Sequence, residues 1–166
     1  MGAPMTDNSQ GGQELQDGPE EPKAILVAVD TSSQAEKVVS AAARLSRGAP
    51  MATLHVAHVF RSSGLTRGGS PPLSNADVIE DAKEHLAYHV SQAKRQSRAS
   101  VVGHFVVGDP TLEILKLCSD LHADALVVGT HDHVGFERLL LGSIAETLVR
   151  KAPCSVMVVR TSEHSR

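Results

Sequence analysis

Short, continuous apolar runs alternate along the chain with longer segments in which apolar residues recur every three or four positions. The apolar runs lie at 24–29, 52–59, 101–107, 125–128 and 155–159. Runs of this length are typical of strands buried on both faces of a parallel sheet. The segments between them predict amphipathic helices. The order βαβαβαβαβ, with right-handed crossovers, predicts one α/β domain: a five-stranded parallel sheet with helices on both faces.

Each helical segment has an apolar face, and the two helices that begin near residues 33 and 110 differ in how they are expected to start. Asp109 followed by Pro110 predicts an N-cap with proline at the first helical position. Ser33 and Glu36 have the spacing of a capping box. The residues expected to face the core from the helices are Ala35, Val38, Val39, Ala42, Leu45, Ile79, Ala82, Leu86, Val90, Ala93, Leu112, Leu115, Cys118, Ile144, Leu148 and Ala152.

The two ends of the chain differ from the middle in composition. Residues 1–22 contain five acidic residues, no Lys or Arg, and almost no apolar side chains. Such a segment buries too little surface to offset the entropy lost on ordering, so we expect a disordered acidic tail. We expect the folded domain at 23–161 and a flexible C-terminus at 162–166.

Composition narrows the function classes. The chain has three Phe, one Tyr and no Trp, and its net charge is −3. This argues against a base-stacking platform or a basic field for nucleic acid. Neither a signal peptide nor an apolar run of membrane-spanning length is visible, so we expect a cytoplasmic protein with no membrane partner. Cys118 and Cys154 are expected to be reduced, buried thiols.

A Gly/Ser/Pro-rich segment at 60–75 carries Arg61 and Arg67. Loops of this length are usually functional or disordered. Two interpretations stay open: a lid whose arginines reach a ligand's phosphates, and a solvated variable loop.

Three motifs together resemble the universal stress protein family. They are AILVAVDTSS at 24–33, VVGDP at 106–110 and VVGTHDHVGFERLLLGSIAETLVRKAPCSVMVVR at 127–160. The resemblance covers about residues 23–160. It implies an adenine nucleotide alpha hydrolase-like fold with strand order 3-2-1-4-5, and a homodimer formed by antiparallel pairing of the fifth strands. Many members bind ATP in a crevice beside strands 1 and 4, and others have lost the binding motif.

The glycine motif of the binding members is kept here in spacing but changed at one residue. Gly129 is followed by two residues and then by Asp132, where the family has a second glycine; nine residues later come Gly142 and Ser143. A carboxylate about 5 Å from a phosphate repels it by roughly 3 kcal/mol at an effective dielectric of about 20. Asp132 instead stabilises a nucleotide if it shares Mg²⁺ with the phosphates.

The resemblance implies a set of ligand-binding residues in the crevice. Gly142 and Ser143 open the last helix, where free N–H groups attract phosphate; alternatively, Ser143 caps that helix through capping-box spacing with Glu146. Asp30 is implied to lie near base and ribose. The full set is Ala28, Asp30, Val56, Val128, Gly129, Thr130, Asp132, Gly142, Ser143 and Ile144.

The sequence offers two candidate metal sites and lacks the catalytic motifs that such folds carry. His85 and His89 are spaced i, i+4 on a helix, yet a solvated helix face is favoured over metal ligation. His131 and His133, beside Asp132, form a second metal candidate. A nucleophile elbow, a P-loop and a Lys in the glycine loop are all missing, so we expect no enzyme. The sequence thus predicts a dimeric ATP-binding regulatory protein of the stress response; a dimeric interaction module without a ligand is the alternative.

Overall fold

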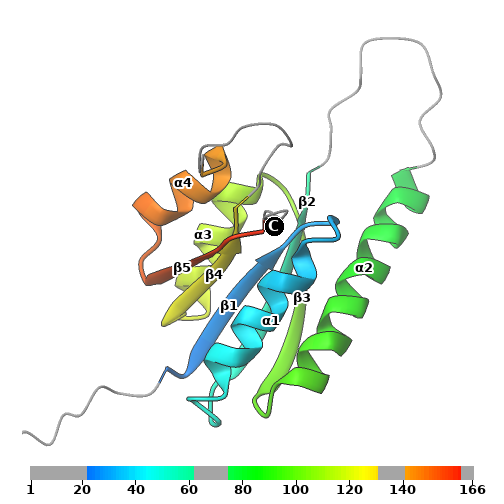
Figure 1. Ribbon diagram of the computed structural model, residues 1–166. Helices are drawn as coiled ribbons and strands as arrows, with labels where there is room; N and C mark the ends of the chain where they lie inside the picture. Colours follow the sequence, from blue (N-terminus) through cyan, green and yellow to red (C-terminus); the bar gives the residue numbers. More distant parts are fainter. Residues whose placement is uncertain (1–21, 62–74, 131–140, 162–166) are drawn as a thin grey trace, which may run out of the picture.

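The computed structural model describes residues 22–61, 75–130 and 141–161 (Figure 1). Some of the predicted features lie outside these ranges: the acidic tail up to residue 21, most of the 60–75 loop with Arg67, the segment with His131, Asp132 and His133, and the C-terminus after residue 161.

Strands and helices alternate through the described chain. The strands are β1 (Ala24–Val29), β2 (Thr53–Phe60), β3 (Ser100–Val107), β4 (Ala125–Gly129) and β5 (Ser155–Val159). The helices are α1 (Ala35–Ser46), α2 (Asn75–Gln96), α3 (Pro110–Asp120) and α4 (Ser143–Lys151). No described helix is both long and apolar enough to cross a membrane.

The strands form one parallel sheet in the order β3-β2-β1-β4-β5, which confirms the predicted fold (Figure 1). β1 lies at the centre, where Val27 pairs with Val56 of β2 on one side and Val127 of β4 on the other. All three side chains are fully buried. The chain reverses its direction of travel across the sheet between β1 and β4, and ligands in such sheets bind at this switch point.

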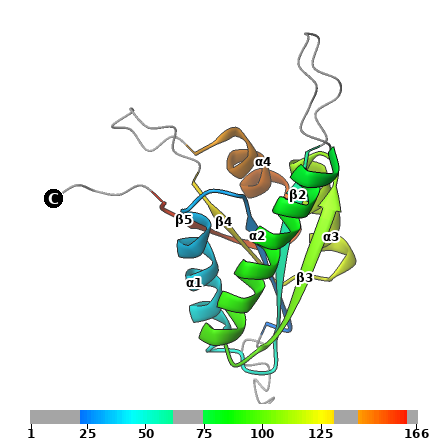
Figure 2. The ribbon, with the colours of Figure 1, turned by 90° about the vertical axis from the view of Figure 1, so that its right-hand side faces the viewer.

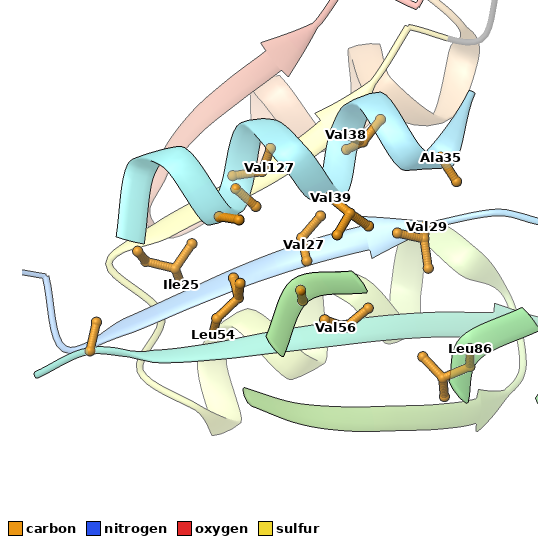
Figure 3. Close-up of a cluster of buried hydrophobic side chains, with 14 of the residues drawn as sticks. Ile25, Val27, Val29, Ala35, Val38, Val39, Leu54, Val56, Leu86 and Val127 are labelled. Carbon is orange, nitrogen blue, oxygen red and sulfur yellow. The ribbon is translucent and has the colours of Figure 1, made fainter. Parts of the chain in front are cut away.

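Helices of the described chain cover both faces of the sheet (Figure 2). α1 and α2 pack on one face, where Val38, Val39 and Leu86 meet the central strands. Figure 3 shows the side chains of this cluster filling the space between α1 and strands β1 and β2. Most core residues predicted for α1 and α2 are buried here, because helical spacing of three and four residues places them on a single face.

α3 and α4 cover the opposite face, where two of the predicted core residues are exposed. Ile114 and Cys118 are buried, but Leu112 is 67% exposed. A residue two positions before Ile114 lies across the helix from it and therefore faces solvent. On α4, Leu148 is buried as predicted, whereas Ile144 is 38% exposed.

One of the two helix-start predictions for α1 and α3 is confirmed and the other is wrong. Asp109 Oδ1 accepts hydrogen bonds from Thr111 N at 2.9 Å and Leu112 N at 3.1 Å, as expected of an N-cap. The capping box predicted for α1 does not form, because Gln34 occupies the N-cap position and makes no side-chain cap bond. Asp30 organises that turn instead.

Candidate functional site

A cavity of about 400 Å³ opens at the carboxyl ends of β1, β2 and β4. Its wall is largely apolar, with Val29, Val38 and Leu148 among the lining side chains. The carboxyl ends of the strands, the β1–α1 turn and the first turns of α3 and α4 all meet there. In Figure 1 the start of α4 lies at the same end of the sheet as the carboxyl end of β1.

The structure brings most of the predicted binding residues together around this cavity. Val56 is the exception: it is fully buried in the core under α1 and does not reach the cavity. The next residues of β2, Ala57 to Val59, line it instead, because the cavity lies beyond the end of the core. Asp132 is outside the described residues. The predicted residues that line the cavity are Ala28, Asp30, Val128, Gly129, Thr130, Gly142, Ser143 and Ile144.

The β1–α1 turn is built around Asp30. Its Oδ1 accepts hydrogen bonds from Ser32 N at 3.0 Å and from Ser32 Oγ at 2.6 Å. Aspartate commonly stabilises turns by bonding to the backbone two residues later. Asp30 therefore shapes one rim of the cavity and also brings a carboxylate to it.

Gly129 is glycine for a reason that the sequence did not indicate. A Cβ on Gly129 would lie 3.0 Å from Val38 Cγ2 and 3.2 Å from Thr161 Cγ2. Both contacts are tighter than carbon atoms normally make, so a side chain here would push on α1 and on the residue after β5. Close packing by the protein itself accounts for this glycine.

Thr161 is hydrogen-bonded to Thr130, the residue that follows β4. Its backbone N–H donates to Thr130 Oγ1 at 3.2 Å, and its hydroxyl donates to the backbone oxygen of Thr130. Thr130 N in turn donates to the backbone oxygen of Val159 at 2.9 Å. Thr130 and Thr161 are 4% and 2% exposed. The hydroxyl of Thr130 is thus engaged by the protein itself at the cavity wall.

α4 begins at the cavity without a side-chain cap. Gly142 is the N-cap, and Glu146 N donates to its backbone oxygen at 2.9 Å. The capping box predicted for Ser143 and Glu146 does not form; Glu146 pairs with Arg150 at 3.0 Å instead. The first-turn N–H groups of Ser143, Ile144 and Ala145 have no intrahelical acceptor. Together with the helix dipole they make this end of the cavity attractive to an anion.

His58 is a cavity residue that sequence reasoning missed. It is 7% exposed, and its Nδ1 lies 3.0 Å from the backbone oxygen of Val29. A carbonyl oxygen only accepts, so this nitrogen carries the proton. Its position near the end of a predicted strand was the available signal. The other cavity residues not predicted are Val29, Ser32, Gln34, Ala35, Val38, Ala57, Val59, Pro110, Ile114, Ala145, Leu148 and Thr161.

His89 corrects the solvated-face prediction for α2. Its side chain is 3% exposed and its Nδ1 has no hydrogen-bond partner, whereas His85 is exposed. Burial lowers the pKa of His89, and the nearby His85 lowers it further, while Glu36 and Asp30 raise it. No three His, Cys, Asp or Glu side chains of the described residues are grouped to hold a metal ion.

Cys118 of α3 and Cys154, directly before β5, lie in the same apolar cluster. Cys118 is buried and Cys154 is partly buried, and both are free thiols. Burial, strengthened by the neighbouring Cys154, raises the pKa of Cys118 to about 12. A thiol with such a pKa carries almost no thiolate at neutral pH, so it is a poor nucleophile.

The fold and the cavity together define a structural class of ligand-binding domain. The molecule is a doubly wound α/β domain with a ligand-sized cavity at the switch point of its sheet and a helix N-terminus opening on that cavity. The family model described as the universal stress protein family matches residues 21–160. The chain belongs to this family.

Similar proteins agree with this assignment. Universal stress protein A homolog 1 of Coxiella burnetii is 31% identical over 151 residues, covering 85% of this chain and 98% of the relative. The universal stress protein from Archaeoglobus fulgidus in complex with dAMP is 29% identical, with a TM-score of 0.63 over 82% of this chain and 96% of that one. A universal stress protein in complex with cAMP is 25% identical, with a TM-score of 0.66 over 85% and 99%.

Proposed function

We propose that this protein binds an adenine nucleotide in the cavity and acts as a regulatory module of the stress response. The observation that carries the proposal is the uncapped start of α4, whose N–H groups open on an apolar cavity at the sheet's switch point. This combination offers an anion site beside a surface suited to a purine base.

The ligands of related structures support an adenine nucleotide. The two similar structures named above hold dAMP and cAMP. Each combines an adenine base with a phosphate, which are the two chemical parts that the cavity offers places for. ATP is the nucleotide that the glycine motif suggests, and Asp132 sets how well a triphosphate is tolerated.

The strand order suggests how the nucleotide lies. The phosphate belongs at the start of α4, next to β4, with Gly142 and Ser143. Neighbouring strands are about 4.8 Å apart, so β2 lies about 10 Å away across β1. A nucleoside extending in that direction passes Asp30 and ends against Ala57 and Val59. The carboxylate of Asp30 is then suited to accept hydrogen bonds from ribose hydroxyls.

We propose binding rather than turnover. Thr130 is engaged with Thr161, and the one imidazole at the described cavity wall, His58, is bonded to a backbone oxygen. Among the described residues, His58 makes no hydrogen bond to a hydroxyl or thiol, and a general base must reach the group that it deprotonates. We therefore propose that the protein signals by whether a nucleotide occupies the cavity, and not by converting that nucleotide.

Calorimetric titration with AMP, ATP with and without Mg²⁺, and GTP tests the proposal. Adenine nucleotides are expected to bind and to raise the melting temperature, with GTP weaker. The variant Ala28→Leu, which fills part of the cavity, should lose binding, while Val107→Leu at the exposed end of β3 should keep it. A folded protein that binds no nucleotide at millimolar concentration would instead favour an interaction module with no ligand.

We also propose a homodimer formed along β5. This strand is an edge of the sheet, and Met157 on it is 42% exposed. Exposed edges readily pair with a second strand. Light scattering should give twice the chain mass for the native protein and a monomer for Met157→Asp. A monomeric native protein at micromolar concentration would exclude this arrangement.

A further inference from the structure

A pair of histidines lies on the outer part of the sheet, away from the nucleotide cavity. His55 of β2 and His104 of β3 place Nδ1 and Nε2 2.9 Å apart, with ring centroids 5.1 Å apart and ring planes inclined by 41°. β3 is the edge strand, visible beside α2 in Figure 2. Both rings are partly exposed, and neither lines the cavity.

The backbone fixes this pair. His55 stands opposite Val102 in the β2–β3 register, and His104 stands opposite Ala57, so the two histidines are diagonal neighbours. Residues two apart on a strand share a face, so both rings project from the face that α3 and α4 cover further along the sheet. α3 packs against β2, and Val102 beside the pair remains 41% exposed. The two nitrogens are therefore held together at a surface that water reaches.

We propose that His55 and His104 form a two-imidazole binding site for a divalent transition metal of the Cu²⁺ class. Two nitrogens at about 2.0 Å from a metal lie about 2.8 Å apart in neighbouring positions of a square plane, and about 3.3 Å apart in a tetrahedron. The observed 2.9 Å is the length of the hydrogen bond between the two rings, so it shows that the two nitrogens lie close enough to share one ion once the rings turn. Among divalent first-row ions Cu²⁺ favours the square-planar geometry and binds imidazole most strongly.

Metal binding needs only small changes in the pair. One of the two facing nitrogens carries the proton of their hydrogen bond, and that ring must shift to its other neutral tautomer so that both facing nitrogens present lone pairs. The proton moves to the second nitrogen of the same ring, so the ring stays neutral and no proton is released to solvent. Because the facing nitrogens point at each other in the hydrogen bond, each ring must also turn about χ2, a soft torsion, before both lone pairs face one ion. Water completes the coordination, since the pair supplies two protein ligands.

Titration of the full-length protein with Cu²⁺, followed by calorimetry and electron paramagnetic resonance, tests the site. We expect one Cu²⁺ with two nitrogen ligands. His55→Asn and His104→Asn should each weaken binding roughly a hundredfold, because the second imidazole of a chelating pair binds at a high effective concentration. His85→Asn and His122→Asn, on histidines outside the pair, are matched controls and should leave the affinity unchanged. Zn²⁺ should bind more weakly than Cu²⁺.

Unchanged Cu²⁺ affinity in both folded variants would overturn the proposal, as would a two-nitrogen signal that His85→Asn or His122→Asn removes. Circular dichroism establishes folding. If one variant does not fold, the other still decides the question, and slower reaction of the pair with diethyl pyrocarbonate in the presence of Cu²⁺ is a measurement on the unchanged chain. Nucleotide binding is measured separately, so failure of this site leaves the proposed function untouched.

Discussion

The end of β4 and the start of α4 both carry a motif glycine beside the cavity, but the surroundings of the two glycines are opposite. At Gly129 a side chain would press against Val38 and Thr161. Gly142 begins a helix whose free N–H groups open on the cavity, and its φ of −59° is accessible to any residue. Packing leaves little room for a side chain at the first glycine, whereas the second leaves an anion site uncovered. Two glycines of one sequence motif can thus be explained by different physical constraints, here packing at Gly129 and an open helix start at Gly142.

The largest expected effect is the loss of stability on substitution of Gly129. Gly129→Val should lower the free energy of unfolding by about 1–3 kcal/mol, because the added carbons press against Val38 and Thr161. Urea denaturation measures the loss. Gly48→Val is the control, since a Cβ there meets only Leu45 O at an ordinary 3.6 Å. Equal stability of the two variants would show that the site around Gly129 has room to spare.

The second prediction has opposite signs for stability and binding. Gly142→Asp should raise the free energy of unfolding by about 0.5–1 kcal/mol, because an aspartate caps the helix and complements its dipole. The same carboxylate occupies the N–H groups and repels phosphate, so nucleotide affinity should fall by roughly tenfold or more. Denaturation and calorimetry measure the two effects.

Gly48→Asp, at the far end of α1, is the charge control for this variant. A Gly142→Asp protein that is more stable but binds nucleotide as well as the native chain would contradict the assignment of the phosphate to the start of α4.

A smaller effect on stability is expected from the hydrogen bonds between Thr161 and Thr130, beside Gly129. Thr161→Val keeps the shape of the side chain but removes its hydroxyl hydrogen bond to the backbone oxygen of Thr130. The loss should be about 1 kcal/mol, the usual contribution of a single buried hydrogen bond. Thr147→Val, whose hydroxyl bonds within its own helix to Ser143 O, should change stability much less. If Thr161→Val and Thr147→Val lose similar amounts of stability, the hydrogen bond between Thr161 and Thr130 contributes nothing beyond an ordinary helix hydroxyl.

The smallest effect concerns His89, behind the β1–α1 turn that borders the cavity. Its pKa is lowered in the folded protein, chiefly by burial, so the unfolded chain binds more protons below about pH 6.5. Its contribution to stability is therefore present above that pH and is lost as the pH falls toward the folded pKa. The slope is a fraction of the about 1.4 kcal/mol per pH unit that one full proton gives.

Denaturation at pH 7.5 and 5.5 measures this slope. His89→Leu should show a smaller difference between the two pH values than the native protein, while His122→Asn should behave like the native protein, because His122 is exposed and is not among the groups that shift the pKa of His89. An unchanged slope in His89→Leu would assign the pH dependence to other groups.

The apolar patterns predicted most of the fold. Runs such as 24–29 and 125–128 are buried on both faces, and such runs identify central parallel strands without reference to the rest of the chain. The strand order and the crevice came from the family resemblance, and the structure confirms that order. Errors arose where a local signal was ambiguous: Leu112 was placed on the wrong side of α3, and two capping boxes did not form.

Features that depend on neighbours along the chain could be predicted from the amino-acid order alone: the strands, the helices and the Asp109 cap. Most residues around the cavity were implied by the family resemblance. Contacts between residues distant in sequence, such as Val38 and Thr161 closing over Gly129, or His55 meeting His104, were established only by the folded molecule. These contacts are fixed by how strands and helices pack, and packing joins residues whose separation along the chain carries no local signal.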